Sequence, residues 1–253
     1  MIFITGDCHA DWSRFSQRRF IQQNELTRND YVIVCGDFGI WHDTKEERYW
    51  LDWLSKKQFT ILFVDGNHEN FDRLNSGEFQ LVDFLDGKAH KIRDNIYHLL
   101  RGYVFNINGK TVFAFGGAAS HDIDDGILDE KDYDNKEDFS KLVKHYRKER
   151  KCFRINHVSW WKEEMPSPQE MELGRINLEK NNNKVDYIIT HCCPQEIASI
   201  FSRGFYKPDT LTTFFNDVAT TVDFDKWFFG HYHDDLYILD KYIMLYEQIY
   251  RID

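Results

Sequence analysis

Short apolar runs recur along this chain, and each one ends at a glycine or a polar residue. The runs are rich in β-branched and aromatic residues, which is typical of buried strands. The clearest runs are Ile2–Thr5, Tyr31–Val34, Thr60–Val64, Tyr187–Thr190 and Trp227–Phe229. We therefore predict buried strands at these positions, with the polar residues that follow them at the carboxyl ends of the strands.

Amphipathic segments of helical period separate these runs. Residues 11–24 carry three aromatic side chains behind a candidate N-cap at Asp11, and the segment from Thr44 has capping-box spacing with Glu47. Both segments are predicted to be crossover helices. The alternation of strands and helices indicates a layered α/β fold, either α/β/β/α or α/β/α.

Two hairpins are also predicted, so the sheet should be mixed. Asn108-Gly109 lies between the apolar runs 103–107 and 111–115, which is a strong signal for a two-residue type I′ turn. The runs 236–239 and 242–246, joined at residues 240–241, form the second candidate.

The segment from about residue 118 to 183 breaks this rhythm. It is highly charged through residues 131–151, then carries Trp160-Trp161, and then a helix start at Ser167-Pro168. We predict one domain over residues 1–253, with 118–183 as an insertion that packs over the active-site edge. The Trp pair has two interpretations, a wall for a flat group or a plug for the core, and the plug is favoured.

Charge and cysteine content narrow the function classes. The 253 residues carry a formal net charge of −10, which disfavours strong nonspecific binding to nucleic acid or to an anionic membrane. Five cysteines without a CxxC pair indicate a reduced compartment. No apolar stretch approaches the roughly 20 residues of a spanning helix. We expect a soluble, cytoplasmic protein without a membrane partner.

Six short motifs, most of them directly after an apolar run, carry the candidate chemistry. They are Gly6-Asp7-Cys8-His9, Gly36-Asp37, Gly66-Asn67-His68-Glu69, Thr190-His191, Gly230-His231 and His233. Their oxygen and imidazole donors suit two divalent metal ions, with zinc, manganese or iron as candidates. The carboxyl ends of adjacent strands form one edge, where α/β sheets build binding sites. Asp37 is the candidate carboxylate shared by both ions.

The order and content of these motifs resemble the calcineurin-like metallophosphoesterase superfamily over residues 5–234. The resemblance implies two packed mixed β-sheets flanked by helices, with the metals at one sheet edge. It implies that one metal is held by Asp7, His9 and His233, that the other is held by Asn67, His191 and His231, and that Asp37 lies between them. It also implies that His68 is the general acid or a phosphate-binding group.

The loop that opens the insertion adds two tentative substrate-binding residues, His121 and Asp122. They follow Gly116-Gly117-Ala118, at the end of a predicted strand, where polar groups would face the metal cleft. The alternative is a solvated acidic loop. The Gly-Gly-Ala-x-Ser pattern followed by Trp-Trp-x-Glu-Glu is similar to a bacterial and phage-borne branch of the superfamily.

The expected reaction is hydrolysis of a phosphate ester by metal-activated hydroxide. Ser/Thr protein phosphatases extend the second motif to GDxxDRG, but here Gly36-Asp37 continues as Phe38-Gly39-Ile40-Trp41. The missing Arg slightly favours a phosphodiester or nucleotide substrate. A Ser/Thr-type protein or small-molecule phosphomonoesterase is the alternative, with a non-catalytic metal-binding interaction module behind it. The expected partner is a phosphorylated small molecule, a nucleotide or a phosphoprotein. Arg14, Arg73, Arg101 and Arg203 are candidates to replace the missing Arg.

Overall fold

Seven strands form the first of two large mixed sheets in the computed structural model, which describes residues 1–252. Its centre is the parallel set β1, β2, β3 and β6, and the strands beyond these run antiparallel. In order across the sheet the strands are β15 (Ile249–Ile252), β1 (Ile2–Thr5), β2 (Tyr31–Val34), β3 (Thr60–Phe63), β6 (Ile96–Leu99), β5 (Gly87–Arg93) and β4 (Gln80–Phe84).

The second sheet has six strands and the same plan, a parallel centre with antiparallel edges. Its order is β13 (Leu236–Ile238), β14 (Tyr242–Met244), β12 (Asp223–Phe229), β11 (Lys184–Thr190), β8 (Lys110–Phe115) and β7 (Tyr103–Ile107). Both predicted hairpins are confirmed. In the β7–β8 turn, Asn108 and Gly109 have φ values of 51° and 79°, as a type I′ turn requires.

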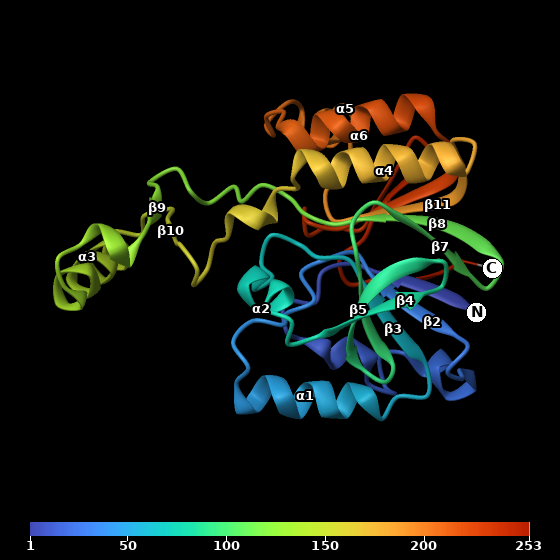
Figure 1. Ribbon diagram of the computed structural model, residues 1–253, viewed down its shortest axis with the longest axis horizontal. Helices are drawn as coiled ribbons and strands as arrows, with labels where there is room; N and C mark the ends of the chain where they lie inside the picture. Colours follow the sequence, from blue (N-terminus) through green and yellow to red (C-terminus); the bar gives the residue numbers. More distant parts are fainter. Residues whose placement is uncertain (253) are drawn as a thin grey trace.

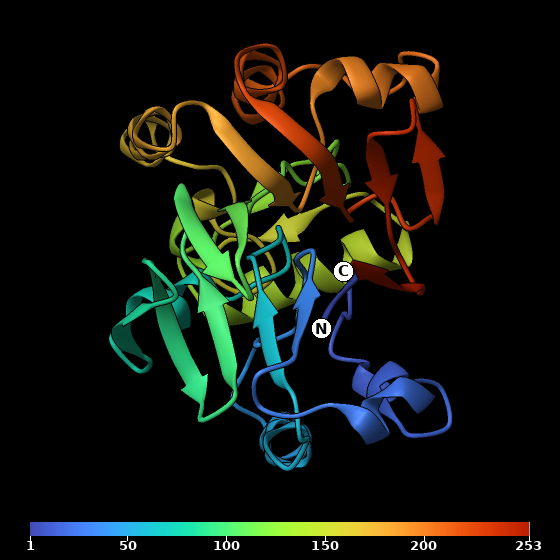
Figure 2. The same ribbon diagram turned by 90° about the vertical axis from the view of Figure 1, so that its right-hand side faces the viewer.

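Helices cover the outer face of each sheet, which gives an α/β/β/α arrangement (Figure 1). In Figure 2 helix α1 (blue) and helix α4 (gold) are seen end-on, on opposite sides of the two sheets. The first sheet is covered by η1 (Trp12–Phe15), η2 (Ile21–Glu25), α1 (Lys45–Ser55) and α2 (Phe71–Asn75), and the second by α4 (Pro168–Lys180), α5 (Gln195–Ser202) and α6 (Thr210–Thr221). No helix within residues 1–252 is long and apolar enough to span a membrane.

The strands are apolar on both faces because each sheet packs on two layers. In β1, Ile2 and Ile4 lie in the core shared by the two sheets, whereas Phe3 packs into the helix layer. In β8, Val112 contributes to the shared core and Phe113 to the core beneath the helices of the second sheet. Strands buried on both faces read as continuous apolar runs, and for that reason the runs stood out in the sequence.

The prediction of one continuous helix over residues 11–24 is wrong. Its place is taken by two short 3₁₀ helices, η1 and η2, although Asp11 does cap η1 by accepting the Ser13 N–H. Phe15 and Phe20 are both buried, yet a spacing of five residues does not return to the same side of an α-helix. Breaking the helix between them allows both rings to enter the core.

The predicted insertion divides into two parts. Strands β8 and β11 are parallel neighbours and so require a crossover, and α4 provides it by packing on the second sheet. At Gly174 an added Cβ would lie 3.3 Å from the Phe113 and Phe115 rings, so α4 sits close against β8. The segment assigned to the insertion therefore contains one helix that belongs to the main body.

Residues 121–160, which we call the arm, extend away from the body on one side (Figure 1). The arm contains β9 (Ile127–Leu128), η3 (Glu130–Asp132), α3 (Lys136–Lys148) and β10 (Arg154–Ile155), and η4 (Lys162–Glu164) follows it. Strands β9 and β10 pair in parallel. Leu128, Phe139 and Val143 form a small core of the arm's own.

The arm is anchored to the body at its base. Trp161 is 2% exposed and packs in the core between the first sheet and its helices, which confirms the plug interpretation for this residue. Its indole Nε1 donates a 2.8 Å hydrogen bond to Asp72, and His157 lies 2.9 Å from the same carboxylate. These contacts fix the chain that follows β10 against α2.

Candidate metal centre

The candidate metal ligands all lie just beyond the carboxyl ends of central strands. The first sheet carries Asp7 and His9 after β1, Asp37 after β2 and Asn67 after β3, and the second carries His191 after β11 and His231 and His233 after β12. Because the two sheets pack face to face with these edges on the same side, ligands from both meet at one place.

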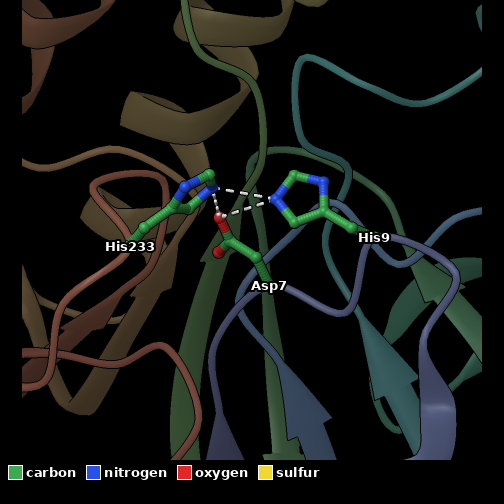
Figure 3. Close-up of side chains that lie close together, drawn as sticks. All are labelled: Asp7, His9 and His233. Carbon is green, nitrogen blue, oxygen red and sulfur yellow. Dashed lines mark hydrogen bonds and ion pairs between the residues drawn. The ribbon is translucent and has the colours of Figure 1, made fainter.

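The set predicted for one metal is brought together in the structure (Figure 3). Nε2 of His233 lies 3.3 Å from the Asp7 Oδ2, and Nε2 of His9 lies 3.6 Å from the same oxygen. The two imidazole nitrogens are 2.9 Å apart. Three donors thus face one point, with Asp7 buried beneath the two rings.

The set predicted for the other metal meets around His191. Its Nε2 is 3.2 Å from the Asn67 Oδ1 and 3.4 Å from the Asp37 Oδ2, and its ring packs 4.9 Å from that of His231. Nδ1 of His191 lies 2.7 Å from the carbonyl oxygen of Cys35. Donation from Nδ1 to that carbonyl fixes the tautomer and leaves Nε2 as a donor for a metal.

Asp37 occupies a position between the two sets. Its Oδ2 is 3.4 Å from Nε2 of His191 and 3.7 Å from Nε2 of His9, so one oxygen atom faces a residue of each set. Its Oδ1 accepts the backbone N–H of His68 at 2.9 Å, which orients the carboxylate. Asp37 is thus near both sets, and its role as a shared carboxylate stays a prediction.

The two tentative substrate residues have different surroundings. Nε2 of His121 lies 2.8 Å from Nε2 of His231, so His121 borders the second set. Asp122 is about half exposed and accepts a 2.7 Å hydrogen bond from Nε of Arg154. His121 thus borders the candidate ligands, and Asp122 orients another side chain.

The motif glycines allow the ligands to approach so closely. A Cβ on Gly66 would lie 2.0 Å from the Asp37 Oδ1, and one on Gly230 would lie 1.9 Å from the Asp7 Oδ1. A Cβ on Gly36 would lie 2.2 Å from the His191 Nδ1. Each of these glycines therefore makes room for a ligand that comes from a different motif.

Backbone strain is concentrated at the same positions. His9, Asp37, His231 and His233 have φ values of 46°, 47°, 68° and 53°, in the left-handed region that non-glycine residues rarely adopt. Such conformations cost of order 1–3 kcal/mol each and persist where the surrounding structure enforces them. Four of the seven candidate ligands are therefore held in a costly backbone conformation.

Two buried carboxylates dominate the electrostatics. Burial alone would raise the pKa of Asp7 and of Asp37, but the charge of His191 and hydrogen bonds from neighbouring imidazoles lower both pKa values below the usual range. For His191, burial lowers the pKa, but Asp37 and Asp7 outweigh it and raise the pKa to about 10. Two anionic groups buried together create a strong local demand for positive charge.

A hydrogen-bond chain from the insertion orients Asn67. The Asn67 amide nitrogen lies 3.3 Å from the Ser120 Oγ as a donor, and that hydroxyl donates at 2.7 Å to Glu164. Glu164 also accepts the Ser120 backbone N–H at 2.9 Å. Burial raises the pKa of Glu164 to about 7. The chain fixes which amide atom faces the metal site, so Asn67 presents its oxygen.

In the sequence, Ser120 and Glu164 occur only within a family-like pattern, which predicts no role for either residue. The Gly-Gly-Ala-x-Ser and Trp-Trp-x-Glu-Glu patterns were the available signal, since they contain these two residues. Their interaction joins positions 44 residues apart in the sequence. Spacing alone gives no indication that they meet.

Arg154 is the residue that sequence reasoning missed altogether. Its Nη1 is 3.2 Å from Nδ1 of His68, and its Nη2 is 3.2 Å from Nε2 of the same ring. His68 is itself placed at the site, with donor atoms grouped with those of His9 and Asp37. Burial lowers the pKa of His68, and the charge of Arg154 lowers it further, against the opposing effect of Asp37.

Three of the four arginines considered from the sequence have structural roles. Arg14 donates to the carbonyl oxygens of Gly6, Asp7 and Tyr246, which ties the first motif to the chain near β15. Arg73 pairs with Glu47 and Glu78, and Arg101 pairs with the buried Asp65. Arg203 ends α5 in an exposed, left-handed conformation.

The donor set fits divalent cations of the zinc, manganese or iron type. The seven candidate ligands offer carboxylate, amide and imidazole donors, which these ions accept. The neighbouring thiols do not compete, because burial raises the pKa of Cys8 to about 12 and that of Cys35 well above its usual value. A buried, protonated thiol is a poor metal ligand.

Comparison with known proteins agrees with this geometry. The sequence profile of the calcineurin-like phosphoesterases matches residues 1–235. Among solved structures, the chain is similar to the phosphopantetheinyl hydrolase of Mycobacterium tuberculosis, with 16% identity, 97% of this chain and 89% of that chain covered, and a TM-score of 0.50. At this identity the likeness shows a shared fold only. The comparison with curated proteins gave no match.

Proposed function

The chain belongs to the calcineurin-like phosphoesterase family and is a metal-dependent hydrolase of phosphoric esters, and we propose that it works with two divalent cations at the centre described above. One cation is assigned to Asp7, His9 and His233, the other to Asn67, His191 and His231, with Asp37 shared. Manganese, zinc and iron are the proposed identities, because they accept mixed oxygen and imidazole donors.

One observation carries this proposal. The Asp37 Oδ2 lies within 4 Å of imidazole nitrogens from both ligand sets, 3.7 Å from His9 and 3.4 Å from His191. A carboxylate in that position would be able to bind both cations. When bound, such a pair lowers the pKa of a water molecule and withdraws charge from the phosphate.

The side chains around the cations have separate tasks in this proposal. Asp7 receives the His231 backbone N–H at 3.0 Å and so keeps its carboxylate aimed at the first set. Ser120 orients the Asn67 amide. His68 follows Asn67 and contacts the substrate, where it donates a hydrogen bond or a proton to the oxygen of the leaving group. No Ser, Cys or His nucleophile is required, so no covalent enzyme intermediate is expected.

Metal content and turnover test the proposal together. Protein purified without chelator is analysed for metal and then assayed with manganese, zinc and iron on p-nitrophenyl phosphate and on bis(p-nitrophenyl) phosphate. We expect two metal ions per chain and hydrolysis of at least one ester. Asp37→Asn should lose metal and activity. A wild-type protein that binds no metal under any of these conditions would contradict the proposal.

The substrate class separates two versions of this function. The missing GDxxDRG arginine slightly favours a phosphodiester or nucleotide over a phosphomonoester. Arg154, however, brings a guanidinium group to His68, which is the kind of positive charge that a dianionic monoester needs. A phosphorylated small molecule or a phosphoprotein is therefore also a proposed substrate.

A further inference from the structure

Arg154 stands at the metal centre but belongs to the arm, which lies outside the strand ends that carry the ligands. From its contacts we infer that Arg154 binds the non-bridging oxygens of the substrate phosphate and biases the enzyme toward phosphomonoesters. This inference rests on the proposed function, since it places a substrate phosphate beside His68.

The hydrogen-bonding capacity of His68 is the first argument. Two guanidinium nitrogens lie 3.2 Å from the two ring nitrogens of His68. A neutral imidazole has one acceptor nitrogen, and a protonated imidazole has none. At least one of these guanidinium nitrogens therefore faces a ring nitrogen that offers no lone pair. A phosphate between the metals and His68 would supply oxygen acceptors at this point.

The position of the guanidinium group is the second argument. The Arg154 side chain is 14% exposed and is oriented by the Asp122 carboxylate at 2.7 Å, with a further contact from Nη1 to the Ser159 carbonyl oxygen at 3.3 Å. These partners bind Nε and Nη1, and both Nη1 and Nη2 lie beside the His68 ring. The planar fork is thus oriented before a substrate arrives, as two-point binding of a phosphate requires.

The backbone of Arg154 is also fixed. It pairs with Ile127 in β9, and its N–H donates to the Gly126 carbonyl oxygen at 3.2 Å. The next residue, Ile155, donates to the Ser159 Oγ at 3.0 Å. Seven residues after Arg154, Trp161 is buried in the body. The guanidinium group therefore has a defined place over the metal centre although it comes from a protruding segment.

The positive charge of Arg154 favours a dianionic phosphomonoester over a diester. The chain as a whole carries a net charge of −10. Arg14, Arg73 and Arg101, the other candidates for a phosphate-binding arginine, have hydrogen-bond acceptors elsewhere. A phosphomonoester brings two negative charges and three terminal oxygens, whereas a diester brings one charge and two terminal oxygens. A fixed guanidinium group gains more from the dianion, because charge-assisted hydrogen bonds strengthen with the charge of the acceptor.

Three variants test the inference in the full-length, metal-loaded protein. Arg154→Gln removes the charge and the fork, and Arg154→Lys keeps the charge but removes the fork. Lys151→Gln is the matched control, because Lys151 pairs with Asp125 in the same arm, away from the centre. Equal circular dichroism spectra and metal contents establish that the variants are folded and loaded.

Two measurements are made on each protein. The first is kcat/KM with manganese for p-nitrophenyl phosphate and for bis(p-nitrophenyl) phosphate. The second is the Kd of inorganic phosphate, measured by calorimetry, which needs no turnover. For Arg154→Gln we expect kcat/KM on the monoester to fall by about tenfold to hundredfold, the range of a lost hydrogen bond between charged groups. For the same variant, kcat/KM on the diester should fall several-fold less than on the monoester, and Kd for phosphate should rise. For Arg154→Lys we expect values between those of the wild type and those of Arg154→Gln.

The outcomes keep the inference separate from the proposed function. If the wild type hydrolyses neither ester but binds phosphate in an Arg154-dependent way, the phosphate-binding role of Arg154 stands, whereas the monoester bias and the proposed function both fail. If the wild type is active while Arg154→Gln matches Lys151→Gln within twofold in both measurements, the inference is overturned. Equal losses on the two esters would overturn the monoester bias.

Discussion

The carboxylate of Glu69 accepts a 2.5 Å hydrogen bond from the backbone N–H of Phe38. It also accepts the N–H of Ile40 at 3.2 Å, so one buried side chain binds the turn that follows Asp37. Burial raises the pKa of Glu69 to about 8, and the nearby charge of Asp37 raises it as well, whereas hydrogen bonds from the backbone N–H groups of Phe38 and Gly39 lower it. Glu69 thus ties the third motif to the second without being a ligand candidate.

We predict that Glu69→Ala releases metal although it removes no proposed ligand. Unpaired, buried N–H groups at Phe38 and Ile40 would each cost about 1–3 kcal/mol, so the turn that holds Asp37 should rearrange. Metal content after gel filtration and the thermal midpoint Tm should both fall. Glu47→Ala is the matched control, because Glu47 accepts the N–H groups of residues 41–43 in the same loop, farther from the centre.

The control should lose stability but retain metal. If Glu69→Ala and Glu47→Ala keep equal amounts of metal, the positioning role of Glu69 is refuted.

Removal of the metals should destabilise the fold itself. Asp7 and Asp37 are each 1% exposed, so cations that bind between them stabilise the native state and not the unfolded chain. At a metal concentration of 100 times Kd this linkage amounts to about 2.7 kcal/mol per site, or roughly 5–10 °C in Tm for a chain of this size. Calorimetry with EDTA and with added manganese measures the shift.

Asp37→Asn provides the comparison for this shift, since it removes the carboxylate that we propose both cations share. Its Tm should respond much less to manganese than that of the wild type. A wild-type Tm that is the same in EDTA and in excess manganese would contradict the prediction.

His68→Ala should impair turnover more than metal retention. His68 is assigned to the leaving group, and proton donation of this kind contributes about 10²–10⁴-fold to the rate. We expect a large fall in kcat with both metals bound, and a smaller fall for good leaving groups such as nitrophenol. His191→Ala should deplete metal, because it removes a proposed ligand. Parallel assays and metal analysis of the two variants separate the roles, and equal metal loss in both would argue against the assignment of His68.

Ser120→Ala should weaken metal binding from outside the ligand set. The change removes the acceptor for the Asn67 amide nitrogen, so the amide is free to rotate and to present nitrogen instead of oxygen. Loss of such an outer partner typically costs about 10–100-fold in metal affinity or activity. Competition with a chromogenic chelator measures the affinity. Ser167→Ala, which removes the N-cap of α4, should lower Tm and leave the metal affinity unchanged.

A Ser120→Ala protein with wild-type metal affinity would show that the hydrogen-bond chain to Glu164 is not needed to orient Asn67.

The strand ends could be predicted because residues that are close together in the sequence determine both the strand and the turn that follows it. An apolar run that ends in Gly-Asp or Gly-His encodes both the buried strand and the tight turn, and Gly66 illustrates why the glycine is required beside Asp37. The arrangement of residues 11–24 was not predictable in the same way. The local pattern there allowed a helix, and the need to bury both Phe15 and Phe20 decided against it.

The contact of the arm residue Arg154 with His68 could not be predicted from the sequence pattern, for a different reason. Arg154 and His68 are 86 positions apart, and 38 residues lie between the end of β8 and the start of β10. No periodicity specifies where a segment of that length returns to the body. Ser120 and Glu164 were visible only as a pattern, since their contact depends on the same return.

Leu128, Phe139 and Val143 form a small core within the arm that is distinct from the cores of the body. Strands β9 and β10 are parallel neighbours at the two ends of the segment that carries α3, and Arg154 is part of this strand pair through its pairing with Ile127. We therefore expect that changes in the length or charge of residues 129–153, between the two strands, leave the contact between Arg154 and His68 in place. Under the proposed function, such changes would alter substrate preference beyond the phosphate without altering the strand ends that carry the candidate ligands.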